Sequence, residues 1–292
     1  MKLNNPEIMK IQKAKKILKE IKKRGFEAFI VGGAVRDIIL NTSINDIDII
    51  TNGRYEEIKN FLICKKKNIK YGVFQIIFEK EKFEITTYRK EGPYLDYRNP
   101  NFVQFITDVK EDLKRRDFTI NSFLMDENGK IIDYINAYHD LHQKQIKTIG
   151  NPETKLKEDA LRIMRLFTLQ AKTNFDIEKE TKKSVINNIS LIHKIKSQDI
   201  LKEIKKITKQ KFYQKAFLSL KQTNAISFLK EFKNSILFTI EANWTKITPE
   251  LFIELSLILD PKIIKSFQFN KKEKTKFQKI LSLYEHLIKK DN

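Results

Sequence analysis

The sequence predicts an α/β (α+β) first half, with a mixed and mainly antiparallel sheet, followed by an all-helical second half. Short apolar runs at residues 28–31 and 46–50 are bounded by glycine and polar residues, as is typical of strands. After residue 155 strand patterns mostly vanish, and apolar residues recur every three or four positions, as in an amphipathic helix. We therefore expect two domains, residues 1–150 and residues 151–292.

The elements of the first half can be placed in order from these patterns and from glycine, proline and polar breaks. The run at 65–67 is basic, and the stretch 91–100 is expected to be a loop because it contains one glycine and two prolines. We expect helices at 7–24, 34–40, 55–63 and 112–125, and strands at 28–31, 46–50, 73–78, 83–88 and 131–134.

Composition excludes several classes of protein. Of the 292 residues, 41% are hydrophobic and 21 are Phe, which favours a folded chain over a disordered one. No apolar run approaches the roughly 20 residues that a membrane helix needs. The single cysteine, Cys64, excludes an internal disulfide and a zinc site built from several cysteines. We expect a cytoplasmic protein that does not bind membranes, and nothing in the sequence indicates a protein partner.

The net charge of +20 favours a polyanionic partner, because Lys and Arg neutralise phosphates and release counterions. Residues 151–292 carry +13 of this charge. A general bias toward Lys is the alternative explanation. However, the chain has only nine Arg beside 48 Lys, and most of these Arg lie in motif-like segments. The planar guanidinium suits phosphate and base-edge recognition, so we expect a nucleic-acid or nucleotide partner.

Asp46 and Asp48 alternate with isoleucines, so on an extended strand both carboxylates would project from one face. Two anions held this close repel each other, and a divalent cation bound between them usually offsets this repulsion. Gly32 and Gly33 lie just upstream, between a predicted strand and a predicted helix, where backbone N–H groups can bind a phosphate. These residues together predict a site that binds a nucleoside triphosphate with a metal ion.

The turn Gly32–Asp37 followed by Asp46 and Asp48 resembles the head of the class II tRNA CCA-adding enzymes and the bacterial poly(A) polymerases. Three further segments strengthen this resemblance, which covers roughly residues 24–182. They are the strand 83–89 with Glu84, the segment 115–121 with Arg116, and the loop 91–98. In the family this loop is present in enzymes that add CCA or A and is reduced in those that add only CC; here it contains Asp96 and Arg98 and follows Arg89.

The segment 158–165 resembles the family's base-selecting helix. Asp159 and Arg162 are three residues apart, so on a helix they would share one face. Cytosine and adenine present an amino donor beside a ring-nitrogen acceptor, whereas guanine and uracil present the reverse. A carboxylate beside a guanidinium therefore fits C and A, and leaves buried groups unpaired with G or U, at a cost of about 1–3 kcal/mol per group. An ordinary ion pair within the helix is the alternative role.

The resemblance implies an enzyme that adds C, C and A to the 3′ end of tRNA from CTP and ATP without a nucleic-acid template. It implies two Mg²⁺ ions held by Asp46 and Asp48, with Glu84 as a further ligand or a solvated strand residue. The other implied nucleotide-binding residues are Gly32, Gly33, Arg36, Arg116, Asp159, Arg162 and Arg165. For Arg116, a surface salt bridge with Asp112 is the alternative role. The Lys-rich helices would bind the tRNA acceptor arm mainly through its phosphates, since A-form RNA offers shape more readily than sequence.

Several alternatives stay open at this point. One is an A-adding enzyme or a poly(A) polymerase; others are an inert RNA-binding protein and a transferase acting on a protein or small molecule. The chain also departs from the family pattern, with Thr168 where a further Arg is usual and with no Arg in the segment 197–200. These departures bear on RNA docking and on the choice of the final nucleotide rather than on nucleotidyl transfer.

Overall fold

The structure is a computed structural model that describes residues 4–291, and it divides into two compact units. Unit 1 contains residues up to 95 together with 100–151, and unit 2 contains residues 96–99 together with those from 152 onward. Four residues of the predicted loop, 96–99, thus belong to the second unit rather than to the first. Each unit is described by itself.

Unit 1 begins with an amphipathic helix packed on a buried strand. The helix α1 (Asn5–Lys22) starts at Asn4, whose side chain accepts from the Glu7 backbone N–H while the Glu7 carboxylate accepts from the Asn4 N–H. This reciprocal capping box satisfies two N–H groups that the helix itself leaves unpaired. The buried residues of α1 recur every three or four positions, and all four residues of β1 (Ala28–Val31) are buried. Both elements were predicted from the same patterns.

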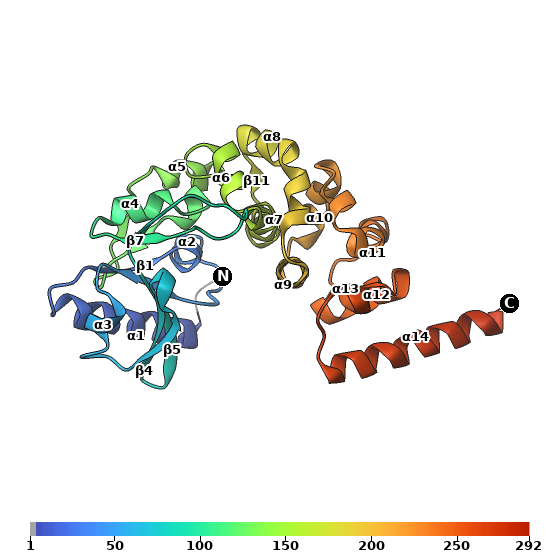
Figure 1. Cartoon of the computed structure of the whole chain (residues 1–292), viewed down its shortest axis with the longest axis horizontal. Coiled ribbons are helices and arrows are strands. Elements are labelled where there is room, and N and C mark those ends of the chain that lie inside the picture. The colour runs from blue at the N-terminus through green and yellow to red at the C-terminus, as the bar shows by residue number, and fades with distance from the viewer. Residues whose placement is uncertain (1–3, 292) are drawn as a thin grey trace. The chain divides into compact units, whose positions relative to one another are not determined.

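The sheet of unit 1, as described within residues 4–291, has seven strands in the order β3-β4-β5-β2-β1-β8-β9. Within it, β2 (Asp48–Thr51) pairs parallel with β5 (Glu81–Thr87) and antiparallel with β1. The strands β3 (Cys64–Asn68) and β4 (Val73–Phe78) continue the sheet antiparallel on the β5 side. The predicted mixed and mainly antiparallel sheet is therefore confirmed (Figure 1).

The remaining elements of unit 1 frame this sheet. Phe29, Val31, Ile50 and Tyr88 pack with residues of α4 (Val109–Lys114) in one buried cluster. The other elements are α2 (Gly33–Ile39), α3 (Tyr55–Ile58), η1 (Ile69–Tyr71), β6 (Arg89–Glu91), β7 (Val103–Phe105), η2 (Thr119–Asn121), β8 (Leu124–Met125), β9 (Ile131–Ile132), α5 (Ala137–His142) and β10 (Gln145–Ile146).

Two predicted helices are shorter in the structure. The helix expected at 112–125 ends at Lys114, because Phe118 is extended and bridges to Thr148 while the Asp117 carboxylate accepts from the Phe118 N–H. The helix expected at 55–63 is only α3, and the basic run that follows it is the edge strand β3. In both places pairing with the rest of the unit overrides local helix propensity.

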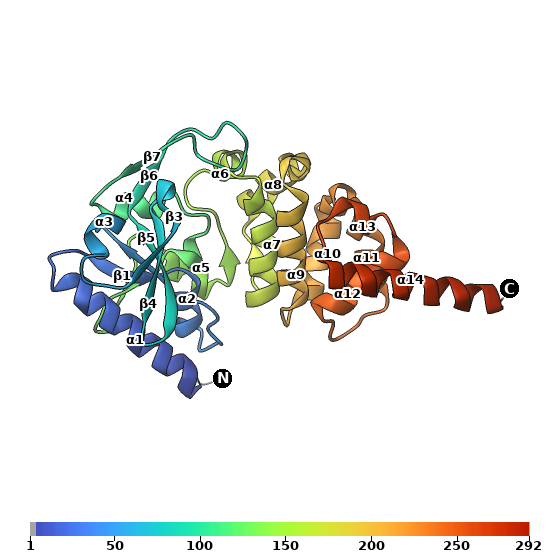
Figure 2. The ribbon, with the colours of Figure 1, turned by 60° about the horizontal axis from the view of Figure 1, so that its bottom comes forward.

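Unit 2 is helical, as predicted. Its elements are α6 (Pro152–Glu158), α7 (Leu161–Thr173), β11 (Asp176–Ile177), α8 (Lys179–Asn187), η3 (Ile189–Lys194), α9 (Ser197–Thr208), α10 (Tyr213–Gln222), η4 (Ala225–Phe228), α11 (Lys230–Glu241), α12 (Pro249–Leu259), α13 (Ile263–Ser266) and α14 (Lys271–Asp291). Phe217, Phe232 and Phe252 are fully buried in its core, where Phe217 and Phe232 each lie against Phe252. Figure 2 shows α7, α9 and α10 side by side in this unit.

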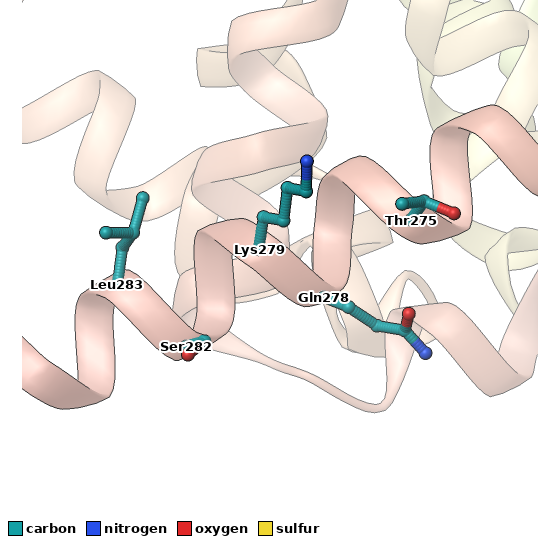
Figure 3. Close-up of a pocket in the computed structure, with 5 residues that line it drawn as sticks. All are labelled: Thr275, Gln278, Lys279, Ser282 and Leu283. Carbon is teal, nitrogen blue, oxygen red and sulfur yellow. The ribbon is translucent and has the colours of Figure 1, made fainter.

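The last helix, α14, packs on α12 and extends past it. A depression of about 560 Å³ on this helix is lined by side chains of α14 alone (Figure 3): Thr275, Gln278, Lys279, Ser282 and Leu283. None of these is a predicted site residue. Within residues 4–291, no helix is both long enough and apolar enough to cross a membrane.

Candidate active site

Asp48 is the first residue of β2, at the start of a central strand. In the register of the parallel pair it lies opposite Glu84 of β5, so the two carboxylates share one face of the sheet. Asp46 precedes the strand by two residues, and Asp46 and Asp48 are both exposed. The structure thus brings Asp48 and Glu84 together, but it places Asp46 in the loop before the strand, contrary to the prediction that both aspartates are strand residues.

Glu84 already has a partner, because the Lys67 ammonium donates a hydrogen bond to its carboxylate. Within residues 4–291, no group of three or more His, Cys, Asp and Glu side chains is arranged to hold a metal ion. Mg²⁺ commonly uses one or two protein carboxylates together with substrate phosphate oxygens and water. Asp46 and Asp48 fit such a nucleotide-assisted ion, and a metal role for Glu84 stays a prediction.

The glycine turn connects β1 to α2. Gly32 has a φ of 82°, a left-handed value that favours glycine, and α2 begins at Gly33. Arg36 is buried and donates to the Asp37 carboxylate at 2.7 Å and to the Asn121 side chain. Its guanidinium lies 3.4 Å from where a Cβ on Gly33 would be. Arg36 therefore supports the turn from inside, and its predicted contact with the triphosphate stays a prediction.

Arg116 lies in a turn after α4 and donates to the Asp112 carboxylate at 3.1 Å. This ion pair was the alternative role for Arg116, and the structure contains it. Burial lowers the pKa of the Arg116 guanidinium, and the carboxylates of Asp112 and Asp48 oppose that shift. Its Nε is buried with no hydrogen-bond partner in the part of the chain that is described. A buried N–H without an acceptor can donate to a phosphate oxygen, and the contact of Arg116 with the triphosphate stays a prediction.

In unit 2, Asp159 lies between α6 and α7, so the prediction that it is a helix residue is wrong. The Arg162 N–H still donates to the Asp159 carbonyl at 3.0 Å, so the two residues are one turn apart. Its Oδ1 accepts from the Leu161 N–H at 3.0 Å, and its Oδ2 accepts from Arg98 Nη1 at 3.0 Å. The Ala160 N–H also donates to the Tyr97 carbonyl at 2.8 Å. The loop segment 96–99 therefore contacts the predicted base-reading carboxylate directly.

Arg162 is buried and donates to the Glu158 carboxylate at 2.6 Å and to the Lys155 carbonyl at 2.7 Å. Burial raises the pKa of the Asp159 carboxyl, and the cations Arg98, Arg162 and Arg165 oppose that rise. These cations are therefore close enough to Asp159 to form one charged cluster with it. Whether Asp159 and Arg162 read a base stays a prediction, as does the role of Arg165, which is exposed on α7.

The other loop residues that were predicted have structural partners. Arg89 donates to the Glu91 carboxylate at 2.6 Å and to the Tyr71 carbonyl. Asp96 accepts from the Arg98 and Asn99 N–H groups, and hydrogen bonds from Asn99 hold the pKa of Asp96 below its usual value. These contacts shape the loop, and a direct role of Arg89 or Asp96 with substrate stays a prediction.

The two departures from the family pattern also have a structural context. The Thr168 hydroxyl donates to the buried Glu203 carboxylate at 2.7 Å. Asp199, in the segment without Arg, lies 3.9 Å from Arg98 Nε. Sequence reasoning named Asp112 as a partner of Arg116 but missed Asn121, Glu158 and Lys67 as partners of site residues. Glu158 had a usable signal, since it lies four residues before Arg162, but Asn121 and Lys67 depend on tertiary pairing.

Comparison with known proteins agrees with this geometry. Residues 28–147 match the family described as "Poly A polymerase head domain", and residues 174–236 match the "Probable RNA and SrmB- binding site of polymerase A". These two matches correspond to the sheet-containing part of unit 1 and to part of the helical unit 2. They define an RNA nucleotidyltransferase.

The chain belongs to the CCA-adding enzyme family. It is 35% identical over 289 residues to the CCA-adding enzyme of Staphylococcus epidermidis, and this match covers 95% of this chain and 70% of that protein. It is 40% identical over 225 residues to the CCA-adding enzyme of Streptococcus gordonii, and this match covers 77% of this chain and 56% of that protein. The CCA-adding enzyme of Bacillus stearothermophilus, solved in complex with CTP, superposes with a TM-score of 0.73 at 25% identity, covering 87% of this chain and 70% of that one. The family resemblance and the fold class predicted from sequence are thus confirmed.

Proposed function

We propose that this chain adds C, C and A in turn to the 3′ end of tRNA, using CTP and ATP without a nucleic-acid template. The observation that carries the proposal is the pairing of Asp48 with Glu84 beside the glycine turn, in a chain of the CCA-adding family. Solved relatives are titled as complexes with CTP, with ATP and with tRNA, which supports the same substrates here. A tRNA substrate also favours a cytoplasmic location.

Asp46 and Asp48 would hold two Mg²⁺ ions together with the phosphate oxygens of the bound nucleotide. Such ions supply charge neutralisation and a lowered pKa of the RNA 3′-hydroxyl when they are bound. The chain's own residues position the triphosphate: the Gly32–Gly33 turn offers close backbone approach, and Arg116 offers its unpartnered Nε within the described structure. In-line attack of the 3′-hydroxyl on the α-phosphorus then joins the nucleotide to the RNA and releases pyrophosphate.

Base choice would lie in unit 2, on the cluster of Asp159 and Arg162. The carboxylate accepts from the amino group of C or A, and the guanidinium donates to the adjacent ring nitrogen. Both side chains are buried, so a base with the reversed pattern leaves them unpaired and is disfavoured. Arg165 and Arg116 would support the nucleotide, and the lysines of residues 151–292 would bind the acceptor arm.

An A-adding enzyme or a poly(A) polymerase is the second candidate, because the matched regions are described as parts of poly(A) polymerases. The test is to incubate the protein and Mg²⁺ with tRNA transcripts that end before CCA, after C and after CC, supplying one labelled nucleotide at a time. Incorporation of C, then C, then A, followed by a stop, supports the proposal. Long A tracts would instead indicate a poly(A) polymerase.

The variant Asp48→Asn sharpens this test, since it removes the charge and keeps the shape. We expect transfer of every nucleotide to fall by at least about 1,000-fold, in line with loss of a group that binds catalytic metal. Glu56→Gln is the matched control, because Glu56 is an exposed carboxylate of α3 paired only with Lys59 in the described structure. Equal activity of the two variants would contradict the assignment, and an inert wild type would overturn the proposed function.

A further inference from the structure

The face of the sheet that carries Asp48 also carries a row of polar side chains that the catalytic assignment does not use. The register places Asp48 opposite Glu84, Glu84 opposite Gln75 of β4, and Gln75 opposite Lys65 of the edge strand β3. Residues directly opposite on paired strands project from the same face. These four side chains therefore form one row across four neighbouring strands, all within unit 1.

The far end of this row is basic and open to solvent. Lys65 and Lys67 are exposed, and Gln75 is half-buried. Lys67 reaches back to the Glu84 carboxylate, and an ammonium group has three donors, so this bond leaves donors for a further anion. The strand spacing of about 4.8 Å puts Lys65 at about 14 Å from Asp48 along the row. The row thus leads from the catalytic carboxylate to two lysines.

The neighbouring lysine projects to the opposite face. Lys66 pairs in register with Phe74, which is fully buried, and its Nζ lies 5.8 Å from the ring centroid of Tyr55 on α3. Tyr55 in turn packs edge to face on Phe74, with the ring centroids 5.6 Å apart. Of the three consecutive lysines of β3, Lys65 and Lys67 therefore project from the face that carries Asp48, and Lys66 projects from the opposite face.

The sheet order separates two sides of Asp48. On the β1 side lies the Gly32–Gly33 turn, which suits the triphosphate of the incoming nucleotide. On the other side lie β5, β4 and β3 (Figure 2). The row ends on β3, at Lys65 and Lys67. Nucleotidyl transfer joins two phosphate-bearing substrates at one carboxylate. The basic row lies on the side of Asp48 opposite to the glycine turn, so it is available to the second substrate, the RNA.

We propose that Lys65, Gln75 and Lys67 bind the phosphodiester backbone at the 3′ end of the RNA that is being extended, and so guide its terminal hydroxyl to Asp48. This inference rests on the proposed function and adds a substrate-binding surface to it. Ammonium groups bind phosphates largely as point charges, so the surface would hold successive terminal nucleotides without reading their bases. That property is required where the sequence of the 3′ end changes at each step of addition.

The test compares two double variants with the same loss of charge. Lys65→Gln with Lys67→Gln removes both cations from the row, and Lys59→Gln with Lys66→Gln removes two cations from around Tyr55 on the other face. We expect the first variant to raise the KM for tRNA about tenfold at moderate salt, with the KM for CTP unchanged. We expect the control variant to leave the KM for tRNA within about twofold of the wild type.

A binding measurement separates this surface from the rest of the enzyme. Fluorescence anisotropy is recorded with a tRNA ending in CC and with the same tRNA lacking its unpaired 3′ nucleotides. The wild type and the control should bind the first RNA more tightly, and the row variant should bind the two RNAs equally. A rise in the KM for CTP instead would assign the lysines to the triphosphate and overturn the proposal, as would a row variant that matches the control. An inactive wild type would contradict the proposed function, while the binding comparison would still test the row.

Discussion

Asp112 is the buried charge on which two guanidinium groups of unit 1 converge. Its carboxylate is fully buried and accepts from Arg115 Nε at 2.8 Å, from Arg116 Nη2 at 3.1 Å and from the Arg89 N–H at 3.0 Å. Burial alone would raise the pKa of Asp112, but the two guanidinium groups outweigh it and hold that pKa below its usual value. Asp112 thereby fixes Arg116, the residue whose Nε we assign to the triphosphate.

We expect Asp112→Asn to lower the free energy of unfolding by about 3–5 kcal/mol, because it leaves two partly buried guanidinium groups without their counter-charge. The carboxylate stabilises the fold at a pH above its unfolded pKa, and this contribution is lost as the pH falls through the lowered folded pKa. Urea unfolding at pH 7 measures the change, with Glu111→Gln, a half-buried carboxylate of the same helix that pairs with Lys114, as the control. Equal midpoints for the two variants would contradict the role of Asp112.

Asp159 predicts a pH dependence of base choice. Because burial raises its carboxyl pKa, this group takes up a proton at a pH where an ordinary carboxyl is still ionised. A protonated carboxyl can donate a hydrogen bond to the carbonyl oxygen that uracil presents where cytosine has its amino group. We expect the ratio of kcat/KM for CTP to that for UTP to fall as the pH is lowered from 8 to 5, starting above the pH at which an ordinary carboxyl takes up its proton. A ratio that stays constant over this range would contradict base reading by Asp159.

At the scale of elements, periodicity predicted most of what forms. The alternation in residues 73–78 and 83–88 predicted β4 and β5 closely, because each strand has one buried face, and the buried runs predicted β1 and α1. The pairing of Asp48 with Glu84 could not be predicted in this way. It depends on the parallel register of β2 and β5, which are separated by two other strands in the chain.

Two of the helical predictions that were wrong, at residues 115–118 and at Asp159, failed because another hydrogen bond replaced the helical one. Residues 115–118 have good helical composition, yet backbone pairing of Phe118 with Thr148 ends the helix early. Asp159 has a helical sequence context too, but its carboxylate accepts from the Leu161 N–H and thereby caps the start of α7. Local side-chain bonds of Asp compete with helix formation, and composition alone does not show which wins.

The loop segment 96–99 predicts a coupling to Asp159. Arg98 donates to the same carboxylate whose ionisation we expect to govern base choice. Arg98→Gln removes the cation that donates to that carboxyl, so the pKa of Asp159 should rise further. We expect the loss of CTP preference to begin at a higher pH than in the wild type. The exposed Lys90→Gln is the control, and identical pH profiles for the two variants would show that Arg98 acts elsewhere.

At the scale of the whole molecule, the net charge of +20 is spread over both halves, with +13 in residues 151–292 and +7 in residues 1–150. Substrates of two sizes should respond to this charge differently. A tRNA spans many phosphates and contacts many lysines, whereas CTP presents one triphosphate to a few fixed groups. We therefore expect the net positive charge to act in RNA binding, whereas base choice depends on a few buried side chains.

We expect the KM for tRNA to rise steeply with salt and the KM for CTP to change little. Each phosphate contact contributes a slope of about 0.7–0.9 in the logarithm of the binding constant against the logarithm of salt concentration. Six such contacts would raise the KM for tRNA several hundred-fold or more between 50 and 200 mM salt, on the order of 10³. Initial rates over this range, with the other substrate saturating, measure both slopes. Because specific ion effects on the protein would alter both constants alike, equal slopes for tRNA and CTP would show that the lysines act on the fold rather than on the RNA.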